Sequence, residues 1–300
     1  MLYTCGGPFS CGIYKSVLKS YAKGGGVMQQ VIIADDFDLD KIINSGQCFR
    51  PQKLADGRYR FINGQELLYI KPIDDTHYAV DCSCGSWGSV WHDYFDFERS
   101  YSQLRSELDS QNDFLQKSLD YGKGIRILHQ QPWEMLISFL ISQRKSIPAI
   151  RTAVEQLASR FGQQVQGSGE SVYLFPTAQQ LALACDEELQ QCGLGYRTRY
   201  VKNAAKAVAG GEVDLSAFAA LSDEQLFNTL MSMDGVGKKV ANCVCLFGYG
   251  RTAMVPIDVW IARLIDEEFG GTNPFPQYGG NAGIVQQYMF YYKRAVAKQK

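Results

Sequence analysis

The 300-residue chain lacks any apolar run of roughly 18 residues, the length that a helix needs to cross a bilayer. It also lacks a basic excess, because 30 Lys and Arg residues face 31 Asp and Glu residues and the net charge is −1. Bulk charge therefore gives no support for nucleic-acid binding, which must come from local basic clusters. A composition with 46% hydrophobic and 20% charged residues is ordinary for a soluble globular protein of one to three domains. We expect no membrane association.

The nine cysteines lack a metal-binding or disulfide pattern. No pair has the C-x-x-C spacing, and no four are arranged as ligands of zinc or of an iron–sulfur cluster. Without a recognisable secretory signal, scattered cysteines predict reduced thiols in a cytosol and no disulfide.

Residues 1–27 look foreign to the rest of the chain. Gly24-Gly25-Gly26 interrupts a weak helical pattern, and Met28 follows shortly afterwards. In a bacterial gene, codons for Lys-Gly-Gly can spell a ribosome-binding sequence at this distance before a start codon. We therefore hypothesise that translation begins at Met28 and that 1–27 is a mis-called leader; the alternative is a genuine disordered tail.

Residues 28–120 are predicted to form a small antiparallel β domain. Apolar runs at Tyr59–Ile62 and Glu66–Ile70 are separated by Asn63-Gly64, and Asn-Gly between such runs is a strong hairpin signal. A helical turn is expected at Asp40–Asn44.

Residues 121–300 are predicted to form an all-helical domain in two parts, because the hydrophobic periodicity is helical from about Tyr101 onward. Ser222 and Gln225 form a capping box at the start of a helix-hairpin-helix expected at 222–247. Helices are predicted at 133–142, 146–161, 177–192, 198–209, 222–233, 238–247, 258–269 and 282–298, with a polar loop at 163–171. The predicted fold class is α+β.

The strongest signal of chemistry lies around a glycine turn. Gly235-Val236-Gly237 stands between two helical patterns, and such a turn lets backbone N–H groups approach a phosphate closely. Lys239 opens the second helix, where the helix dipole and the charge of Lys238 favour a neutral, nucleophilic amine. Asp258 is predicted to N-cap the next helix, which fixes an ionised carboxylate in place.

These residues suit a protein that grips a DNA backbone and attacks a sugar carbon. Taken alone they are equally compatible with a non-enzymatic DNA-binding protein, because glycine turns between helices occur in many such proteins. In that case Asp258 only caps a helix.

Four segments far apart in the chain match one known pattern: Ser45–Arg50, Leu194–Val201, Gly235–Cys243 with Val255–Asp258, and Gln286 with Phe290. Their identity and spacing resemble the helix-hairpin-helix DNA glycosylase superfamily, and specifically the bacterial type of 8-oxoguanine DNA glycosylase. The order of a sheet followed by helices also fits this resemblance.

The resemblance implies a base-excision-repair enzyme that acts on double-stranded DNA containing oxidised guanine. The damaged nucleotide is flipped into a pocket at a cost of a few kcal/mol. The Lys239 amine then attacks C1′ and expels the base, and the resulting Schiff base permits strand cleavage by β-elimination, an AP lyase step. Asp258 supports the developing oxocarbenium charge.

The resemblance also assigns contacts with the base. The Gly46 carbonyl accepts the N7 hydrogen that 8-oxoguanine carries and guanine lacks, and a buried acceptor left facing a lone pair costs about 1–3 kcal/mol. Cys243 and Phe290 form the two sides of a stacking slot, and Gln286 reads the Watson–Crick edge. For Phe290 and Gln286, core packing is the alternative.

Further residues are expected to contact the rest of the duplex. Arg144 is the candidate wedge in the space left by the flipped base, Tyr196 the intercalating residue on the opposite side, and Arg197 a reader of the opposite cytosine. Ala149 stands where familiar members have a second cytosine-reading arginine, so we predict a looser opposite-base preference. Backbone binding is assigned to Gly235, Val236, Gly237 and Lys238.

The resemblance implies that no cofactor is required, although a monovalent cation is suggested on the backbone carbonyls of Met231, Met233 and Val236. Trp260 replaces a histidine of familiar members, which puts a phosphate contact there in doubt. We expect a monomer in a bacterial cytoplasm, associated with the nucleoid through DNA.

Three alternatives remain. A monofunctional alkylbase glycosylase of the same superfamily keeps the aspartate but usually lacks the lysine, so Lys239 argues against it. An endonuclease III-like enzyme carries a C-terminal four-cysteine cluster, and no cysteine follows Cys245. A non-catalytic helix-hairpin-helix DNA-binding protein is the alternative from a different class.

Overall fold

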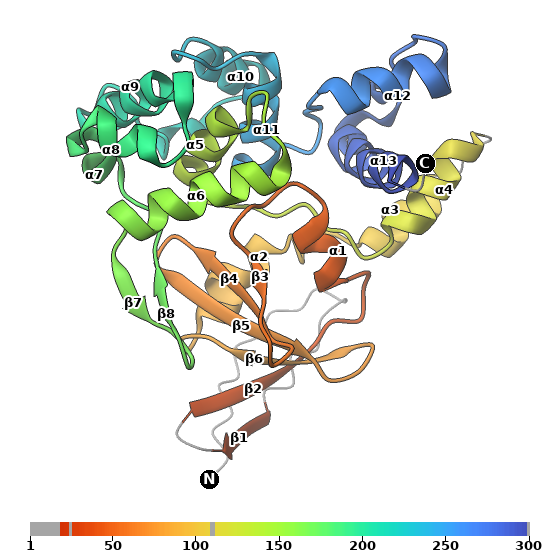
Figure 1. Cartoon of the computed structure of the whole chain (residues 1–300). Helices are drawn as coiled ribbons and strands as arrows, with labels where there is room; N and C mark the ends of the chain where they lie inside the picture. Colours follow the sequence, from red (N-terminus) through yellow and green to blue (C-terminus); the bar gives the residue numbers. More distant parts are fainter. Residues whose placement is uncertain (1–18, 24–25, 109–111, 299–300) are drawn as a thin grey trace.

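The structure, a computed structural model, describes residues 19–23, 26–108 and 112–298 (Figure 1). Its first part is a six-stranded antiparallel sheet in the order β1-β2-β6-β5-β4-β3. The predicted hairpin at Asn63-Gly64 is confirmed, because Asn63 pairs with Glu66 across the turn. The strands are β1 Lys19–Lys23, β2 Gly26–Ile32, β3 Gln52–Lys53, β4 Tyr59–Asn63, β5 Glu66–Pro72 and β6 His77–Asp81.

The predicted domain boundary at residue 28 falls inside β2, which begins at Gly26 and pairs with β1. Residues 1–18 and 24–25 of the predicted leader lie outside the described residues. The proposed translation start at Met28 therefore stays a prediction.

Helices form most of the remaining described chain: α1 Leu39–Asn44, η1 Trp87–Trp91, α2 His92–Tyr94, α3 Tyr101–Glu107, α4 Asp113–Gly122, α5 Pro132–Ser142, α6 Ile147–Phe161, α7 Ala178–Leu183, α8 Asp186–Gln191, η2 Gly195–Arg197, α9 Thr198–Ala209, η3 Ala217–Ala220, α10 Asp223–Met231, α11 Lys238–Tyr249, α12 Val259–Phe269, η4 Phe275–Asn281 and α13 Ala282–Ala297. In the part of the chain that the structure describes, no helix combines the length and apolarity needed to cross a bilayer.

The helices gather in two groups (Figure 1). One group comprises α5 to α11, and the other comprises α12 and α13 with α3 and α4 packed beside them. One hydrophobic core runs through both groups, whereas the sheet has a core of its own with α1 and α2. The α+β fold class with a two-part helical domain is confirmed, although the predicted boundary after residue 120 falls inside α4.

The predicted loop at 163–171 is wrong, because the structure has a small hairpin there. Strands β7 Gln164–Gln166 and β8 Ser171–Tyr173 pair with each other, and Val165 faces Val172. Val172 packs against Ile62 of β4, so the hairpin joins the helical domain to the sheet. Only short apolar alternation marks these strands, and the tertiary contact with the sheet stabilises them.

The predicted helix at 177–192 is two helices, α7 and α8. Ala184 ends the first with ψ 143° and Cys185 begins the second in an extended conformation. The Glu188 carboxylate accepts a hydrogen bond from the Cys185 N–H at 3.2 Å, so a local cap replaces one turn of the continuous helix. Other predicted caps are confirmed, including Ser146 and the Ser222 capping box.

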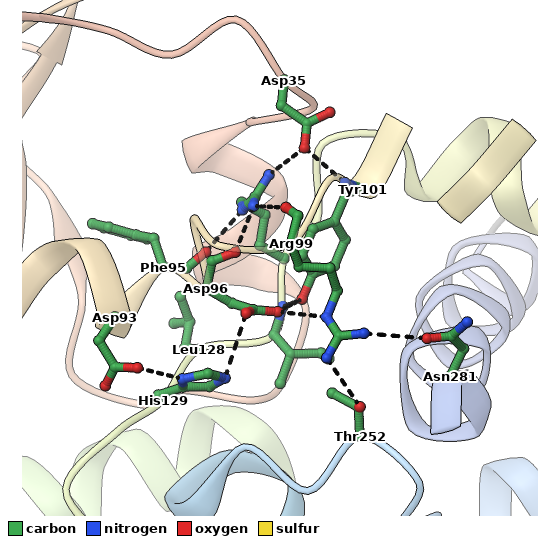
Figure 2. A network of polar contacts seen from close by, with 12 residues as sticks. Asp35, Asp93, Phe95, Asp96, Arg99, Tyr101, Leu128, His129, Thr252 and Asn281 are labelled. Atoms are coloured by element: carbon green, nitrogen blue, oxygen red, sulfur yellow. Dashed lines mark hydrogen bonds and ion pairs between the residues drawn. The ribbon is translucent and has the colours of Figure 1, made fainter. Parts of the chain in front are cut away.

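A buried polar network joins the sheet to both helical groups (Figure 2). The Arg126 guanidinium, fully buried, pairs with Asp35 at 3.0 Å and donates to the Asp96 and Arg99 carbonyls at 2.6 and 2.7 Å. The Arg99 guanidinium in turn donates to Thr252 at 3.3 Å. These contacts fix the sheet domain against the helices and so position the segment after α1.

Candidate active site

A cavity of about 1040 Å³ lies where the two helical groups meet. Its walls come from the turn between α5 and α6, the starts of α11 and α12, the end of α13, and the segment after α1. Lys239, Asp258, Gly46 and Phe290 all line it, so four residues predicted from separate segments share one cavity.

The Lys239 amine is held by two residues of α5. Its Nζ donates a hydrogen bond to the Ser142 hydroxyl oxygen at 3.0 Å and lies 4.9 Å from the centre of the Phe139 ring. Both partners line the cavity, so the amine lies inside it rather than in bulk water. Sequence analysis missed Ser142 and Phe139, because they are about 100 positions away and lie in an apolar helix that reads only as core.

Asp258 is the N-cap of α12, as predicted. Its Oδ1 accepts hydrogen bonds from the backbone N–H groups of Trp260 and Ile261 at 3.0 and 2.9 Å. A single carboxylate oxygen serves both bonds, so the cap fixes the group without using Oδ2. The carboxylate is thereby held on the wall of the cavity that also contains the Lys239 amine.

The segment at Gly46 is fixed against Phe290. Gly46 has φ 91°, and a Cβ added there would lie 3.0 Å from Phe290 Cε1, so this close approach requires glycine. The preceding carbonyl, of Ser45, accepts a hydrogen bond from Gln287 Nε2 at 2.8 Å. On the other side, the buried Gln47 amide donates to the Arg126 carbonyl at 2.8 Å. The Gly46 backbone is therefore held rigidly at the cavity wall.

Cys243 and Gln286 are buried next to the cavity lining. Cys243 is buried, and burial raises the pKa of its thiol to about 11, so the thiol stays protonated. Gln286 is 4% exposed, and its Oε1 has no hydrogen-bond partner among the described residues. Neither side chain lines the cavity in this structure, whereas Phe290 does.

The three residues expected to contact the duplex around the flipped nucleotide differ in exposure. Arg144 is exposed beside the cavity with a left-handed φ of 53°, and the Tyr196 side chain is 54% exposed. Arg197 is buried, and its guanidinium donates to the backbone carbonyls of Gln143 and Leu194. The structure therefore presents Arg144 and Tyr196 at the surface, while the Arg197 guanidinium is occupied by the backbone carbonyls of Gln143 and Leu194.

The hairpin between α10 and α11 has the expected glycine geometry. Gly235 has φ 80°, and a Cβ there would lie 2.3 Å from the Tyr200 ring. Gly237 and Lys238 are exposed at the start of α11, where N–H groups are available to an anion.

For the predicted cation, the Met233 carbonyl already accepts the Val236 N–H at 3.1 Å and keeps one further lone pair. Met231, the third predicted residue of this site, ends α10. The described residues hold no group of three or more His, Cys, Asp or Glu suited to a metal ion. The carbonyl site therefore stays a prediction.

Two family models together match residues 31–277 of the chain. Residues 31–136 match the 8-oxoguanine DNA glycosylase N-terminal domain, and residues 137–277 match the HhH-GPD superfamily of base excision DNA repair proteins. The N-glycosylase/DNA lyase of Saccharomyces cerevisiae is 35% identical over 257 residues, which are 77% of this chain and 68% of the relative. The chain belongs to the 8-oxoguanine DNA glycosylase family.

Two further relatives align with this chain over almost their whole length. A probable N-glycosylase/DNA lyase of Methanothermobacter thermautotrophicus is 26% identical over 86% of this chain and 94% of its own. The 8-oxoguanine glycosylase/lyase of Clostridium acetobutylicum, solved with double-stranded DNA containing cytosine opposite 8-oxoguanine, is 28% identical. That structure superposes with a TM-score of 0.85 over 95% of this chain and 99% of its own.

Proposed function

We propose that this member of the 8-oxoguanine DNA glycosylase family is a bifunctional N-glycosylase and AP lyase that removes 8-oxoguanine from double-stranded DNA. The observation that carries the proposal is the Lys239 amine, held by Ser142 inside a cavity that it shares with Asp258 and Gly46. The names of the yeast and Clostridium relatives support the same reaction.

In the proposed reaction the Lys239 amine attacks C1′ of the everted deoxyribose. The C1′–N9 bond breaks, and the base leaves with the electron pair and takes up a proton. The new C1′–N bond becomes an imine as the sugar ring opens and O4′ is protonated. Loss of a proton from C2′ then breaks the C3′–O3′ bond, which cuts the strand. The Asp258 carboxylate stabilises positive charge that develops at C1′ in the first step.

Recognition of the base is assigned to Gly46 and Phe290, which line the same cavity as Lys239. The rigidly held Gly46 offers its carbonyl to the N7 hydrogen of 8-oxoguanine, and guanine would face that carbonyl with a lone pair. Phe290 supplies an aromatic face for stacking. Cys243 is assigned to the other side of the stacking slot and Gln286 to the Watson–Crick edge; both side chains are buried, and the Cys243 thiol interacts with the Lys239 amine.

Binding of the DNA duplex outside the flipped base is assigned to the exposed surface around the cavity. The hairpin at Gly235-Val236-Gly237 and the Lys238 amine bind backbone phosphate, with a monovalent cation on the nearby carbonyls as part of the proposal. Arg144 is assigned as the wedge that enters the space left by the flipped base, and Tyr196 as the residue that intercalates on the opposite side. The protein is proposed to act as a monomer in a bacterial cytoplasm.

Borohydride trapping tests the proposal. Borohydride reduces an imine to a stable amine, so the wild-type protein incubated with a duplex carrying 8-oxoguanine is expected to give a covalent protein–DNA adduct. The Lys239→Gln variant is expected to give none, because the amide cannot form an imine.

Lys238→Gln is the matched control, since it removes the neighbouring amine. Adduct formation should persist there with weaker DNA binding. An adduct that survives Lys239→Gln contradicts the assigned nucleophile. Excision without any adduct supports a monofunctional glycosylase, and DNA binding without excision supports a binding module.

A further inference from the structure

Helix α13 brings a further cation to the cavity, Arg294, one turn after Phe290. Its guanidinium carbon lies 5.2 Å from the centre of the Phe290 ring. Its Nη1 lies 3.3 Å from the point where a Cβ on Gly46 would stand. The guanidinium therefore touches both residues to which the proposed function assigns contact with the base.

Arg294 differs from its neighbour in how its charge is balanced. The Lys293 amine pairs with Glu267 and Glu268 at 2.7 and 2.6 Å. Arg294 has no such ion pair with any residue that the structure describes, although it is half-buried. Burial lowers the pKa of Arg294, and the nearby negative charge of Asp258 opposes this shift. The guanidinium stacks on the Phe290 ring but has no ion pair among the described residues, so its N–H donors are suited to a ligand that brings an oxygen acceptor.

We propose that Arg294 is a specificity-determining residue that donates a hydrogen bond to the oxygen at C8 of the everted base. The proposal rests on the proposed function, which places N7 of the base at the Gly46 carbonyl. The oxygen at C8 is attached to the ring atom next to N7, and Nη1 lies next to Gly46, the residue proposed to contact N7. Guanine carries a hydrogen at C8 and offers no acceptor there.

Gly46 and Arg294 thus read adjacent positions of the lesion with opposite polarity. Gly46 accepts from the hydrogen that oxidation adds at N7, and Arg294 donates to the oxygen that oxidation adds at C8. Ordinary guanine would leave the Gly46 carbonyl and the Arg294 guanidinium without a hydrogen-bond partner. The free-energy cost of each unpaired group therefore disfavours the binding of guanine.

Equilibrium binding to three duplexes tests this assignment without requiring catalysis. The first carries 8-oxoguanine on a 2′-fluoro-arabino sugar, which resists glycosidic cleavage, the second carries guanine on the same sugar, and the third carries a tetrahydrofuran abasic analogue. For Arg294→Met, the preference for 8-oxoguanine over guanine is expected to fall at least about tenfold, the scale of one hydrogen bond to a charged group. The Kd for the abasic duplex should stay within about twofold.

Arg160→Met is the matched control, because Arg160 is an exposed arginine on α6 outside the cavity. All three affinities should match those of the wild type. An unchanged preference in Arg294→Met overturns the proposal. An equal loss on all three duplexes also overturns it, since that pattern indicates a phosphate contact.

If Arg294→Met does not unfold cooperatively, Arg294→Gln is measured in its place, and the same fall in preference is expected because the amide is shorter and uncharged. An unchanged preference there contradicts the assignment. Borohydride trapping by the wild-type protein reports separately on the proposed function, so failure of one proposal is distinguishable from failure of the other.

Discussion

At the scale of single residues, Asp258 combines an observed structural role with a proposed chemical role, and substitution can separate the two. Asn caps a helix about as well as Asp, so Asp258→Asn should keep the bonds to the Trp260 and Ile261 N–H groups. It removes the negative charge, and we expect the single-turnover excision rate to fall by about 10²–10³-fold. The thermal midpoint should change little.

Asp258→Ala is the matched comparison, since it loses the charge and also about 1 kcal/mol of capping. Equal thermal midpoints in the two variants would show that the cap is not important for stability. Near wild-type excision by Asp258→Asn would show that the carboxylate has no chemical role.

A second prediction at this scale concerns how strongly the protein discriminates among the bases opposite the lesion. Arg197 is held by backbone carbonyls, and Ala149 lacks a side chain that could read a base. We therefore expect excision rates opposite cytosine, thymine, guanine and adenine to agree within about tenfold, because neither residue makes the direct base contact that would provide about 1–3 kcal/mol of discrimination. Single-turnover cleavage of four duplexes measures this, and reaction of the cytosine-paired duplex alone would refute it.

At the scale of elements, the hairpin before α11 depends on contact between two segments. Gly235→Ala adds a Cβ 2.3 Å from the Tyr200 ring in a left-handed conformation, so strain and overpacking combine. We expect the free energy of unfolding to fall by about 2–4 kcal/mol, and affinity for undamaged duplex DNA to fall as the hairpin shifts. Denaturant unfolding and fluorescence anisotropy measure the two effects.

Gly211→Ala provides the control for backbone strain alone. Gly211 has a similar φ of 77°, and nothing lies within 4 Å of an added Cβ. The variant should lose about 1 kcal/mol and bind DNA normally. Equal destabilisation of the two variants would show that the Tyr200 contact does not matter.

The sequence predicted the ends of helices correctly where a residue nearby in the chain forms the cap. The Ser222 capping box and the Asp258 cap involve residues within three positions of each other, so the residue types were sufficient. The break between α7 and α8 was missed, because Cys185 is an unusual N-cap residue. The hairpin of β7 and β8 was also missed, since its stability comes from packing on Ile62, more than 100 residues earlier.

At the scale of the whole molecule, the ion pair of Arg126 and Asp35 holds the junction between sheet and helices. Burial alone would raise the pKa of Asp35, but hydrogen bonds from Ser102, Tyr101 and Arg126 outweigh it and lower the pKa to about 2. Because the folded pKa lies below the ordinary value near 4, this carboxylate stabilises the fold above about pH 4. The contribution is lost as the pH falls towards 2.

We therefore expect Asp35→Asn to lower the free energy of unfolding at pH 7 by about 3 kcal/mol, since it leaves Arg126 buried without its charge partner. The difference from wild type should shrink between about pH 4 and pH 2. Denaturant unfolding across this range measures it, with the exposed Asp56→Asn as a control that should change stability little. A difference that does not depend on pH would show that packing, rather than charge, is responsible.

The sequence by itself determined the fold class, most helices and the hairpin glycines, because these follow from local caps and turns. From a family pattern it also singled out Lys239, Asp258, Gly46 and Phe290, which line one cavity. Only the tertiary structure decided that Ser142 holds the amine, that Cys243 and Gln286 are covered, and that Arg294 reaches Gly46. Each of these contacts joins side chains from distant segments, and their distance and burial depend on how the two helical groups and the sheet pack together. Side-chain chemistry is a property of the residue, whereas access to a ligand is a property of the packing around it.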